Sequence, residues 1–297
     1  MSDFIGIADL GPDGLAEVLA LGAEVKKDPA GVAGTRSGLR VGLFFMKPST
    51  RTRVSSEVAT VDLGGHPVVL RQDEVGLGSR ESVRDVACTL DRYLDVLALR
   101  VFEHGTLVEV ADAAQAPVIN LLSDLEHPCQ VLADLQTVAE NFPLTGSRLA
   151  YVGDGNNVCH SLMVAAAMAG MEVRVAAPPS FQPDPVYVSE ASRFGTVEVS
   201  PDPEAAVEGA DVVYTDAWTS MGQEEEQQAR VAQFSGFRVD EALFENASDE
   251  AIFLHCLPAH RGEEVSDGVI DHARSRVFDQ AENRLHSFKA LLLHLTE

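Results

Sequence analysis

The feature that most constrains this fold is an alternation of short apolar runs with helical patterns. In the first half of the chain, apolar runs at residues 39–45, 67–70, 95–99 and 118–121 alternate with helical patterns near 49–62, 80–92, 106–114 and 128–141. Apolar runs of this length are typical of buried strands, and strands separated by helices form βαβ units. The first half therefore predicts a parallel sheet flanked by helices.

The second half of the chain repeats this alternation. Its strand-like runs lie near residues 149–152, 172–176, 196–199, 211–214 and 252–255, with helical patterns between them. Helical periodicity breaks at 142–147, where Pro143 and Gly146 stand. The chain has 297 residues, which is enough for two domains. We expect an α/β fold with one parallel sheet in residues 1–142 and another in 143–282.

An apolar stripe marks the last helical pattern, at residues 282–295. Leu285, Phe288, Leu292 and Leu295 share one face of that helix. Because an apolar face is stable only when it is covered, this helix must pack against another part of the chain.

The charge balance is strongly acidic. The chain carries 46 acidic and 22 basic residues, which gives a formal net charge of −24. Such a field repels polyanions, so nucleic acid is excluded as a partner. An acidic surface is also typical of proteins from a salt-rich cytoplasm, because a Debye length of about 3 Å at 1 M salt relieves self-repulsion. Ordinary acidity for solubility is the alternative.

No segment has the pattern of an export signal or a membrane span. The N-terminus MSDFIGIADL has no positively charged leader, and the longest nearly apolar run, 162–171, is half of the roughly 20 residues that cross a bilayer.

The cysteines form no CxxC pair, which disfavours a zinc site and a disulfide framework. They are Cys88, Cys129, Cys159 and Cys256. We expect a cytoplasmic protein with reduced thiols and no membrane partner.

The segment STRTR predicts an anion site. Ser49, Thr50, Arg51 and Thr52 follow an apolar strand and open a helix, so backbone N–H groups and the positive end of the helix dipole face the same point. Three hydroxyl groups can donate hydrogen bonds there, and a guanidinium matches phosphate or carboxylate oxygens. The alternative is a simple helix cap with arginines that pair with surface acids.

Other polar groups also follow predicted strands, where ligands bind in open α/β sheets. Arg100 closes an apolar run, and His127 and Gln130 lie one turn apart at a strand-to-helix junction. Taken alone, Arg100 is typical of a surface salt bridge and His127 of a structural cap.

The segment GDGNN at 153–157 suggests a dinucleotide site, but Val158 replaces the third glycine of the fingerprint. A dinucleotide-dependent dehydrogenase is therefore disfavoured.

Six segments together resemble the aspartate and ornithine carbamoyltransferase family. They are STRTR (49–53), HPCQVLADLQTV (127–138), YVGDGNNVCHSLM (151–163), DAWTSMGQEEE (216–226), FLHCLPAHRGEEV (253–265) and FDQAENRLH (278–286). They stand in the family's order and span nearly the whole chain. DAWTSMG and HCLP match the ornithine branch, whereas an aspartate site would need extra cations for a second carboxylate. Met46 departs from that branch, which commonly has an acidic residue there, and this puts local loop contacts in doubt.

The resemblance implies carbamoyl phosphate as one substrate. The residues that match its binding positions are Ser49, Thr50, Arg51, Thr52, Arg100, His127, Gln130, Cys256, Leu257 and Arg284. Thr52, Arg100 and His127 would polarise the carbamoyl carbonyl in the manner of an oxyanion hole. Arg284, early in the last helix, would reach back to the carbamoyl group. Residues 283–297 would therefore return to the first domain.

The same resemblance implies ornithine as the second substrate. The matching residues are Leu122, Asn157, Asp216, Ser220 and Met221. Asn157, Asp216 and Ser220 would hold the α-amino and α-carboxylate region, although Asn157 could instead cap a helix and Asp216 could be a solvated loop acid. Cys256 and Asp216 would lie near the side-chain amine, with the carbonyl of Leu257 near the carbamoyl NH₂. The loop around Gly222 would close over ornithine.

The implied reaction transfers the carbamoyl group to the side-chain amine of ornithine and yields citrulline and phosphate, as part of arginine metabolism. Its catalytic residues would be Arg51, Arg100, His127, Asp216 and Cys256. The reaction requires no metal and no organic cofactor. A metal site is also disfavoured because the adjacent His255 and Cys256 should project to opposite sides of an extended chain.

Carbamoyltransferases that act on aspartate, putrescine or N-acetylornithine are the alternatives to ornithine transfer. The bond between Leu257 and Pro258 is a candidate cis peptide. The family implies a homotrimer or a higher assembly of trimers, and residues 79–80 would approach the site of a neighbouring subunit. A non-catalytic binding module is disfavoured because the site groups are all present.

Overall fold

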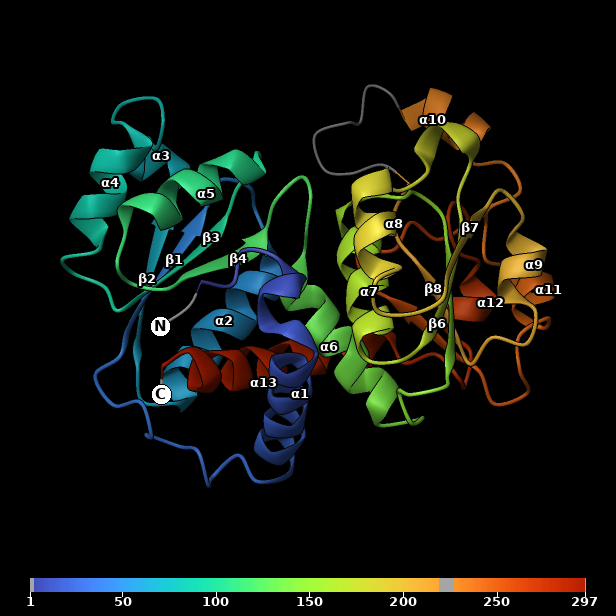
Figure 1. Cartoon of the computed structure of the whole chain (residues 1–297), viewed down its shortest axis with the longest axis horizontal. Coiled ribbons are helices and arrows are strands. Elements are labelled where there is room, and N and C mark those ends of the chain that lie inside the picture. Colours follow the sequence, from blue (N-terminus) through green and yellow to red (C-terminus); the bar gives the residue numbers. More distant parts are fainter. Residues whose placement is uncertain (1–2, 219–226, 297) are drawn as a thin grey trace. The chain divides into compact units, whose positions relative to one another are not determined.

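The computed structural model describes residues 3–218 and 227–296, and the chain forms two compact units (Figure 1). The first unit comprises residues 1–136 and 282–297, and the second comprises residues 137–281. Ser220, Met221 and Gly222, together with the acidic run 224–226, lie outside the described residues. Among the described residues, no helix is both long and apolar enough to cross a membrane.

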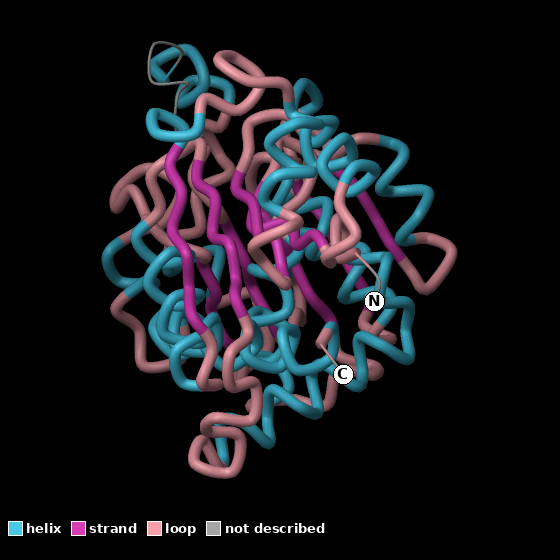
Figure 2. Tube along the Cα trace, turned by 90° about the vertical axis from the view of Figure 1, so that its left-hand side faces the viewer, coloured by secondary structure: helices cyan, strands magenta, loops and turns pink. Residues whose placement is uncertain are grey.

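The first unit contains a parallel sheet of four strands in the order β2-β1-β3-β4. Its elements are η1 (Ile7–Leu10), α1 (Gly11–Lys27), β1 (Arg40–Phe45), α2 (Thr50–Asp62), β2 (His66–Arg71), α3 (Gln72–Val75), α4 (Val83–Leu90), β3 (Val96–Arg100), α5 (His104–Ala113), β4 (Val118–Leu122) and most of α6 (Pro128–Ala139) and α13 (Val277–Leu295). The strands, magenta in Figure 2, are flanked by helices. The fold class that the alternation predicted is confirmed.

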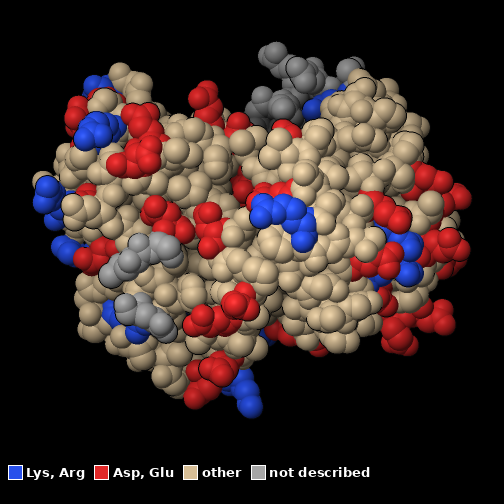
Figure 3. Space-filling view, viewed as in Figure 1, with Lys and Arg blue, Asp and Glu red and all other residues tan. Residues whose placement is uncertain are grey.

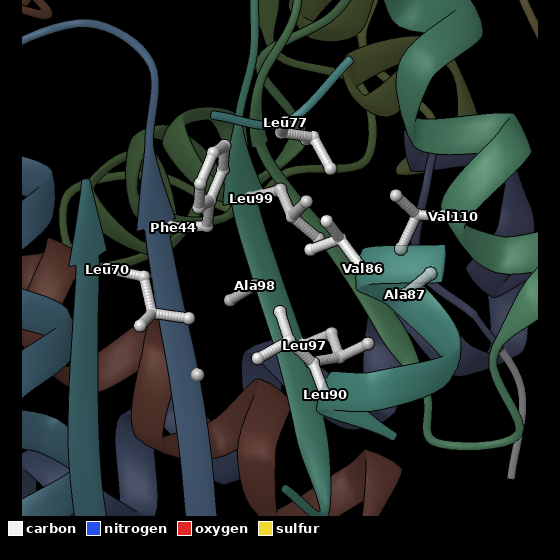
Figure 4. Close-up of a pocket in the computed structure, with 11 residues that line it drawn as sticks. Phe44, Leu70, Leu77, Val86, Ala87, Leu90, Leu97, Ala98, Leu99 and Val110 are labelled. Carbon is white, nitrogen blue, oxygen red and sulfur yellow. The ribbon is translucent and has the colours of Figure 1, made fainter. Parts of the chain in front are cut away.

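Helices α4 and α5 cover one face of the first sheet. Their buried side chains, among them Val86 and Leu107, form one core cluster with Phe44 of β1 and Leu99 of β3. Figure 4 shows a pocket in this layer, between the strands and α4, and every residue that lines it is apolar or glycine. A charged ligand would lose its hydration there without compensation, so this pocket belongs to the hydrophobic core and not to a site for anions.

The C-terminal helix α13 packs within the first unit, as the resemblance implied. Asn283 accepts a hydrogen bond of 2.8 Å from Lys26 of α1, and Lys289 forms an ion pair with Asp62 of α2. The apolar face of α13 is covered, since Phe288, Leu292 and Leu295 are all buried. Residues 282–295 of the helix are therefore part of the first unit, although its first residues, 277–281, belong to the second.

The second unit contains a parallel sheet of five strands in the order β7-β6-β5-β8-β9. Its elements are β5 (Arg148–Val152), α7 (Asn157–Met168), β6 (Glu172–Ala176), η2 (Pro179–Phe181), α8 (Pro185–Ala191), β7 (Val197–Ser200), α9 (Pro203–Val207), β8 (Val212–Thr215), α10 (Gln227–Gln233), α11 (Glu241–Phe244), β9 (Ile252–His255) and α12 (Asp267–Ile270). The sheet core is aliphatic and aromatic, with Val213 and Phe253 fully buried. The predicted strands of the second half are confirmed.

Candidate active site

Each sheet has a point where the strand order reverses. In the first unit β1 lies between β2 and β3, and in the second unit β5 lies between β6 and β8. Ligands of open α/β sheets bind outside the carboxyl ends of the strands at such points. Residues 49–52 follow β1 and Arg100 ends β3, whereas residues 154–157 follow β5 and Asp216 follows β8. These residues, which are part of the predicted site, thus lie at the reversal point of each sheet.

Residues 49–52, which we call the anion cradle after the role predicted for them, lie at the start of α2. Ser49 is the N-cap residue with extended backbone angles (φ −158°, ψ 110°), and its side chain makes no capping hydrogen bond. The first N–H groups of α2 are therefore not satisfied by the cap, and they carry the partial positive charge of the helix end. Thr50 is exposed, Ser49 and Arg51 are half-buried, and Thr52 is buried.

Arg51 and Arg53 have different environments although only one residue separates them. Arg53 forms an ion pair of 2.6 Å with Glu57 one turn along α2, and both side chains are substantially exposed. Within residues 3–218 and 227–296, the side chain of Arg51 has no hydrogen-bond or ion-pair partner. Arg51 is thus the guanidinium at this helix end that remains available for an external anion.

Arg284 connects three helices of the first unit. Its side chain is 5% exposed, donates a hydrogen bond of 3.0 Å to the hydroxyl of Thr52 and donates another to Oε1 of Gln130. Nε2 of Gln130 in turn donates to the buried carboxylate of Asp134 over 2.8 Å. Because Asp134 takes the amide nitrogen, the amide oxygen faces Arg284. The sequence did not predict a role for Asp134, although its position four residues after Gln130 on one helix was a usable signal.

His127 is buried beside two arginines. Burial holds the pKa of His127 well below its usual value, and the nearby Arg284 and Arg100 lower it further. Burial also lowers the pKa of Lys47, with Arg100 adding to the effect and Asp124 opposing it. These groups gather positive charge in a chain that is acidic overall, and a low-dielectric setting strengthens the attraction of an anion.

Leu122 lies at the carboxyl end of β4, next to the end of β3. It pairs with Arg100 in the β3–β4 register, and its carbonyl accepts a hydrogen bond of 2.9 Å from the N–H of Val101. Its side chain is half-buried. The predicted contact of Leu122 with ornithine stays a prediction.

Asp216 is the centre of a hydrogen-bonded cluster in the second unit. Its Oδ1 accepts from the thiol of Cys256 over 2.9 Å and from the N–H of Ala217 over 2.8 Å. Its Oδ2 accepts from Nδ2 of Asn156 over 2.8 Å. The proximity of Asp216 to Cys256 was implied by the resemblance, and the geometry fixes the carboxylate in one orientation.

Asn156 has a role that the sequence reasoning missed. It is the N-cap of α7, and its Oδ1 accepts from the N–H groups of Val158 and Cys159. The same side chain donates to Asp216, so the helix cap and the carboxylate are joined by one amide. Capping had been considered for the neighbouring Asn157, which is instead the first residue of the helix and is half-buried.

A second acid, Asp154, is paired with Arg230. Arg230 donates to Asp154 and, over 2.7 Å, to the carbonyl of Trp218, and its guanidinium lies 4.5 Å from the ring centre of Phe181. Burial raises the pKa of Asp154 to about 7, with Arg230 opposing the shift and Asp216 adding to it. No local pattern predicted this pair, because 76 positions separate its members.

The HCLP segment turns sharply after β9. Leu257 has φ 58°, the left-handed region, and the peptide bond between Leu257 and Pro258 is cis, as predicted.

The side chains of His255 and Cys256 do not project apart, so that expectation was wrong. Among the described residues, each of Asp216, His255 and Cys256 has a possible metal-ligating atom, and these three atoms lie within 4.8 Å of one another. The strand ends at His255, and alternation does not continue through the turn. Both ring nitrogens of His255 are hydrogen-bonded to protein groups, so a metal would have to displace one of them.

Comparisons with known proteins cover nearly the whole chain. Residues 2–140 match the model of the aspartate/ornithine carbamoyltransferase carbamoyl-P binding domain, and residues 145–295 match that of the Asp/Orn binding domain. An ornithine carbamoyltransferase of Acidothermus cellulolyticus is 52% identical, with 99% of this chain and 96% of that protein covered. One of Parasynechococcus marenigrum is 51% identical, with coverage of 99% and 93%.

Solved structures agree with this similarity. The ornithine carbamoyltransferase of Pyrococcus furiosus superposes with a TM-score of 0.94 at 42% identity, covering 98% of this chain and 96% of that one. An acetylornithine transcarbamylase complexed with acetylcitrulline also superposes, with a TM-score of 0.90 at 30% identity and full coverage of both chains.

Proposed function

This chain belongs to the aspartate/ornithine carbamoyltransferase family, and we infer that it transfers the carbamoyl group of carbamoyl phosphate to the side-chain amine of L-ornithine, giving L-citrulline and phosphate. The observation that carries the choice of an amine is the Asp216 carboxylate, which is held between Cys256 and Asn156. A fixed carboxylate suits an ammonium or amine group. The full-length similarity to ornithine enzymes supports the same choice.

The first unit supplies the groups that suit carbamoyl phosphate. We assign the phosphate to the anion cradle and Arg51, with Arg100 neutralising further charge. Thr52, Arg100 and His127 would polarise the carbamoyl carbonyl, and Gln130 and Arg284 would orient the carbamoyl group. His127 fits this role because a neutral imidazole donates one hydrogen bond without adding a positive charge, and preorganised donors of this kind stabilise a developing oxyanion.

The second unit supplies the groups that suit ornithine. We assign Asn157 and Asp216 to the amino-acid substrate, with Ser220 and Met221, which lie outside the described residues, as further partners. Cys256 would lie beside the side-chain amine, and the carbonyl of Leu257 beside the carbamoyl NH₂. These roles rest on the family pattern together with the hydrogen bond between Cys256 and Asp216.

The chemistry requires a neutral amine. A lysine-like amine has an ordinary pKa of about 10.4 and is mostly protonated at neutral pH. The amine must therefore lose one proton before its nitrogen attacks the carbamoyl carbon. The new C–N bond forms as the bond from carbon to the bridging phosphate oxygen breaks, and phosphate leaves with that oxygen. The attacking nitrogen then loses its second proton, which the departing phosphate can take as it becomes hydrogen phosphate. Asp216 and Cys256 are the groups that we expect to hold the amine as it changes protonation state.

Aspartate, putrescine and N-acetylornithine define the alternative substrates. An aspartate site needs cations for a second carboxylate, whereas Arg230 in the second unit is already paired with Asp154. The structural similarity to an acetylornithine transcarbamylase keeps N-acetylornithine as the alternative to test first.

The decisive assay measures carbamoylated product from carbamoyl phosphate with each of the four amines in turn. We expect product with ornithine and a kcat/KM at least about tenfold lower with the other three, since each lacks or blocks a charged group that the site would pair. Product from N-acetylornithine or aspartate alone would overturn the assignment.

We propose that the protein is a homotrimer, which the family pattern implies, and that α2 contributes to the contact between subunits. Val54, Val58 and Val61 form an apolar stripe on α2 and are 55%, 41% and 58% exposed in the single chain. Exposed contiguous apolar side chains mark association surfaces. Residues 79–80, both exposed, would approach a neighbouring subunit. Light scattering should give a mass near three chains, and Val58→Glu should lower it.

We also propose a cytoplasmic location and tolerance of high salt. The four cysteines, all among the described residues, form no disulfide, which suits a reducing compartment. On the face shown in Figure 3, acidic side chains are widely distributed and basic ones are fewer. If the acidity reflects a salt-rich cytoplasm, activity and Tm should rise as KCl approaches molar concentration, whereas a fall in both would leave ordinary acidity as the explanation.

A further inference from the structure

We propose that Glu264 is a positioning residue for this reaction, acting through His255 to fix the turn that carries Cys256 and the carbonyl of Leu257. The proposal rests on the proposed function, because that function assigns Cys256 and Leu257 to the substrates. Neither the sequence patterns nor the proposed function assigns a role to the side chains of Glu264 and His255.

Glu264 is fully buried and bound to the turn from two sides. Its side chain is 0% exposed, as is that of His255. Its Oε1 accepts from Nε2 of His255 over 3.1 Å and from the backbone N–H of His260 over 2.5 Å. A buried carboxylate is stable only when hydrogen-bonded partners compensate for lost hydration, and here those partners flank the turn at residues 256–259.

The hydrogen bonds of His255 define its tautomer. The backbone N–H of Leu257 donates to Nδ1 of His255 over 2.9 Å. A backbone N–H can only donate, so Nδ1 must present its lone pair. In a neutral imidazole the proton is then on Nε2, which is the nitrogen that faces Glu264. The carboxylate therefore selects the tautomer that can accept the N–H of Leu257.

Leu257 needs this acceptor because its backbone conformation is unfavourable. Its φ of 58° lies in the left-handed region, which residues with a Cβ rarely adopt. Such a conformation persists only where surrounding contacts hold it. The bond from the N–H of Leu257 to His255 is one such contact, and the bond from Cys256 to Asp216 holds the preceding residue.

The backbone of His255 is anchored independently of Glu264. Its N–H donates to Oε1 of Gln280 over 2.9 Å, and Nε2 of Gln280 donates to the hydroxyl of Tyr214 over 3.2 Å. With the main chain held in this way, the rotation and the tautomer of the imidazole ring are the features that Glu264 can control. A change at Glu264 should therefore alter the turn and leave β9 in place.

The same atoms argue against a metal at this position. Among the described residues, His260, Glu263 and Glu264 have donor atoms within 4.8 Å of one another. Glu264, however, already accepts from His255 and from the N–H of His260. A cation there would compete with the bonds that hold the turn, so a positioning role accounts for more of the observed contacts.

Two substitutions of His255 separate its two hydrogen bonds. In His255→Asn, Oδ1 stands near the place of Nδ1 and can still accept from Leu257, but the donor to Glu264 is lost. In His255→Gln, the side-chain amide reaches Glu264, but the acceptor for Leu257 is lost. We expect His255→Gln to lower kcat on the order of 10- to 100-fold, with a smaller change in the KM for ornithine, and His255→Asn to lose less.

A matched pair at Glu264 tests the remote residue itself. Glu264→Gln keeps an oxygen that accepts from Nε2 of His255, whereas Glu264→Met removes the acceptor at similar volume. We expect Glu264→Gln to retain most of kcat and Glu264→Met to lose roughly the same factor as His255→Gln, about 10- to 100-fold. Asp267→Asn is the control, since that acid is 75% exposed and forms an exposed ion pair with Arg261.

Two readouts distinguish positioning from simple destabilisation. Nitrogen-15 NMR of the histidine rings should show the Nε2–H tautomer of His255 in the wild type and in Glu264→Gln but a mixture in Glu264→Met. Amide hydrogen exchange at Leu257 should be slow in the wild type and in His255→Asn and faster in His255→Gln. Calorimetric binding of inorganic phosphate, which we assign to the first unit, should be unchanged in every variant.

The experiments distinguish a failure of the positioning role from a failure of the proposed function. If the wild type forms citrulline and the two His255 variants lose activity equally, with equal exchange at Leu257, the positioning role is refuted. It is also refuted if folded Glu264→Met keeps wild-type kcat. If the wild type forms no citrulline, the proposed function fails, whereas the NMR and exchange measurements still decide whether Glu264 controls the turn.

Discussion

Arg284 of α13 donates a hydrogen bond of 3.0 Å to the hydroxyl of Thr52 in α2, although 232 positions separate the two residues. Both side chains are buried in the first unit. Thr52 is part of the anion cradle, so the last helix of the chain directly contacts the segment 49–52. The stability of the cradle therefore depends on how α13 is packed.

Thr52→Val should weaken the cradle without changing its shape. The substitution removes the hydroxyl that accepts from Arg284 and leaves a buried guanidinium donor without that partner, which costs about 1–3 kcal/mol in the free energy of unfolding. We expect a lower affinity for carbamoyl phosphate by calorimetry and a lower urea midpoint. Thr52→Ser keeps the hydroxyl and should retain both properties. Equal behaviour of the two variants would contradict a role for this hydrogen bond.

Arg51→Ala should abolish most carbamoyl phosphate binding and leave the fold intact. Arg51 is the cradle cation with no partner among the described residues, so its loss removes charge-assisted hydrogen bonds to the ligand and no internal bond. Hydrogen bonds to charged groups contribute about 1.5–3 kcal/mol, which corresponds to a loss of affinity of roughly 10- to 100-fold. Calorimetry would measure the affinity and thermal unfolding would measure the stability.

Arg53→Ala is the control for Arg51→Ala on the same helix. Its ion pair with Glu57 is exposed and contributes only about 0–1 kcal/mol to stability. We expect carbamoyl phosphate affinity close to that of the wild type. A loss as large as that of Arg51→Ala would mean that general positive charge, and not the position of Arg51, attracts the ligand.

Asn156→Ser should separate the cap of α7 from the orientation of Asp216. Serine caps helices about as well as asparagine, so the stability of the second unit should change little. The donor to Asp216 is lost, and we expect the KM for ornithine to rise. Asn156→Ala loses both functions and should cost about 1 kcal/mol more in the free energy of unfolding. An unchanged KM in both variants would show that Asp216 needs no support from Asn156.

The alternation of apolar runs and helical patterns was sufficient to predict both sheets. Strands buried on both faces are nearly continuous apolar runs, and β1, with five of its six residues buried, shows why the run at 39–45 was informative. The polar groups after these strands, such as Arg51 and Asp216, could be predicted because parallel strands place their carboxyl ends at one edge. Helix α1 was not predicted, although Leu15, Val18 and Val25 form its buried face.

The residues that sequence reasoning missed act through partners far away in the chain. Asp134 is the exception, since Gln130 is only four positions away. Arg230 finds Asp154 across 76 positions, and Asn156 finds Asp216 across 60. No local pattern encodes which acid a buried arginine will meet, because that pairing is set by sheet order and helix packing. The family pattern indicated the residues that we expect to touch substrate, and the structure adds those that support them.

The titration of Asp154 should make the second unit less stable as pH rises. Burial raises its pKa from 3.8 to about 7 in the folded protein, in spite of the ion pair with Arg230. Between these two values the folded state holds a proton that the unfolded state has lost, so stability is greatest at the acidic end of the window and falls as pH approaches 7. The change attributable to this group between pH 5 and pH 8 is roughly 2–3 kcal/mol.

Asp154→Asn should remove this pH dependence, because asparagine does not titrate. Urea unfolding at pH 5 and pH 8 measures the free energy of unfolding of the variant and of the wild type. Relative to the wild type, the variant should be more stable at pH 8 than at pH 5. Asp271→Asn is the control, because the pKa of Asp271 is shifted in the opposite direction: a hydrogen bond from Arg261 lowers it. Asp271 is therefore ionised in both the folded and the unfolded state above pH 5. The effect of Asp271→Asn on stability should be the same at pH 5 and at pH 8. If Asp154→Asn behaved like Asp271→Asn, the Asp154 carboxyl would have to be ionised throughout, and the ion pair with Arg230 would outweigh burial.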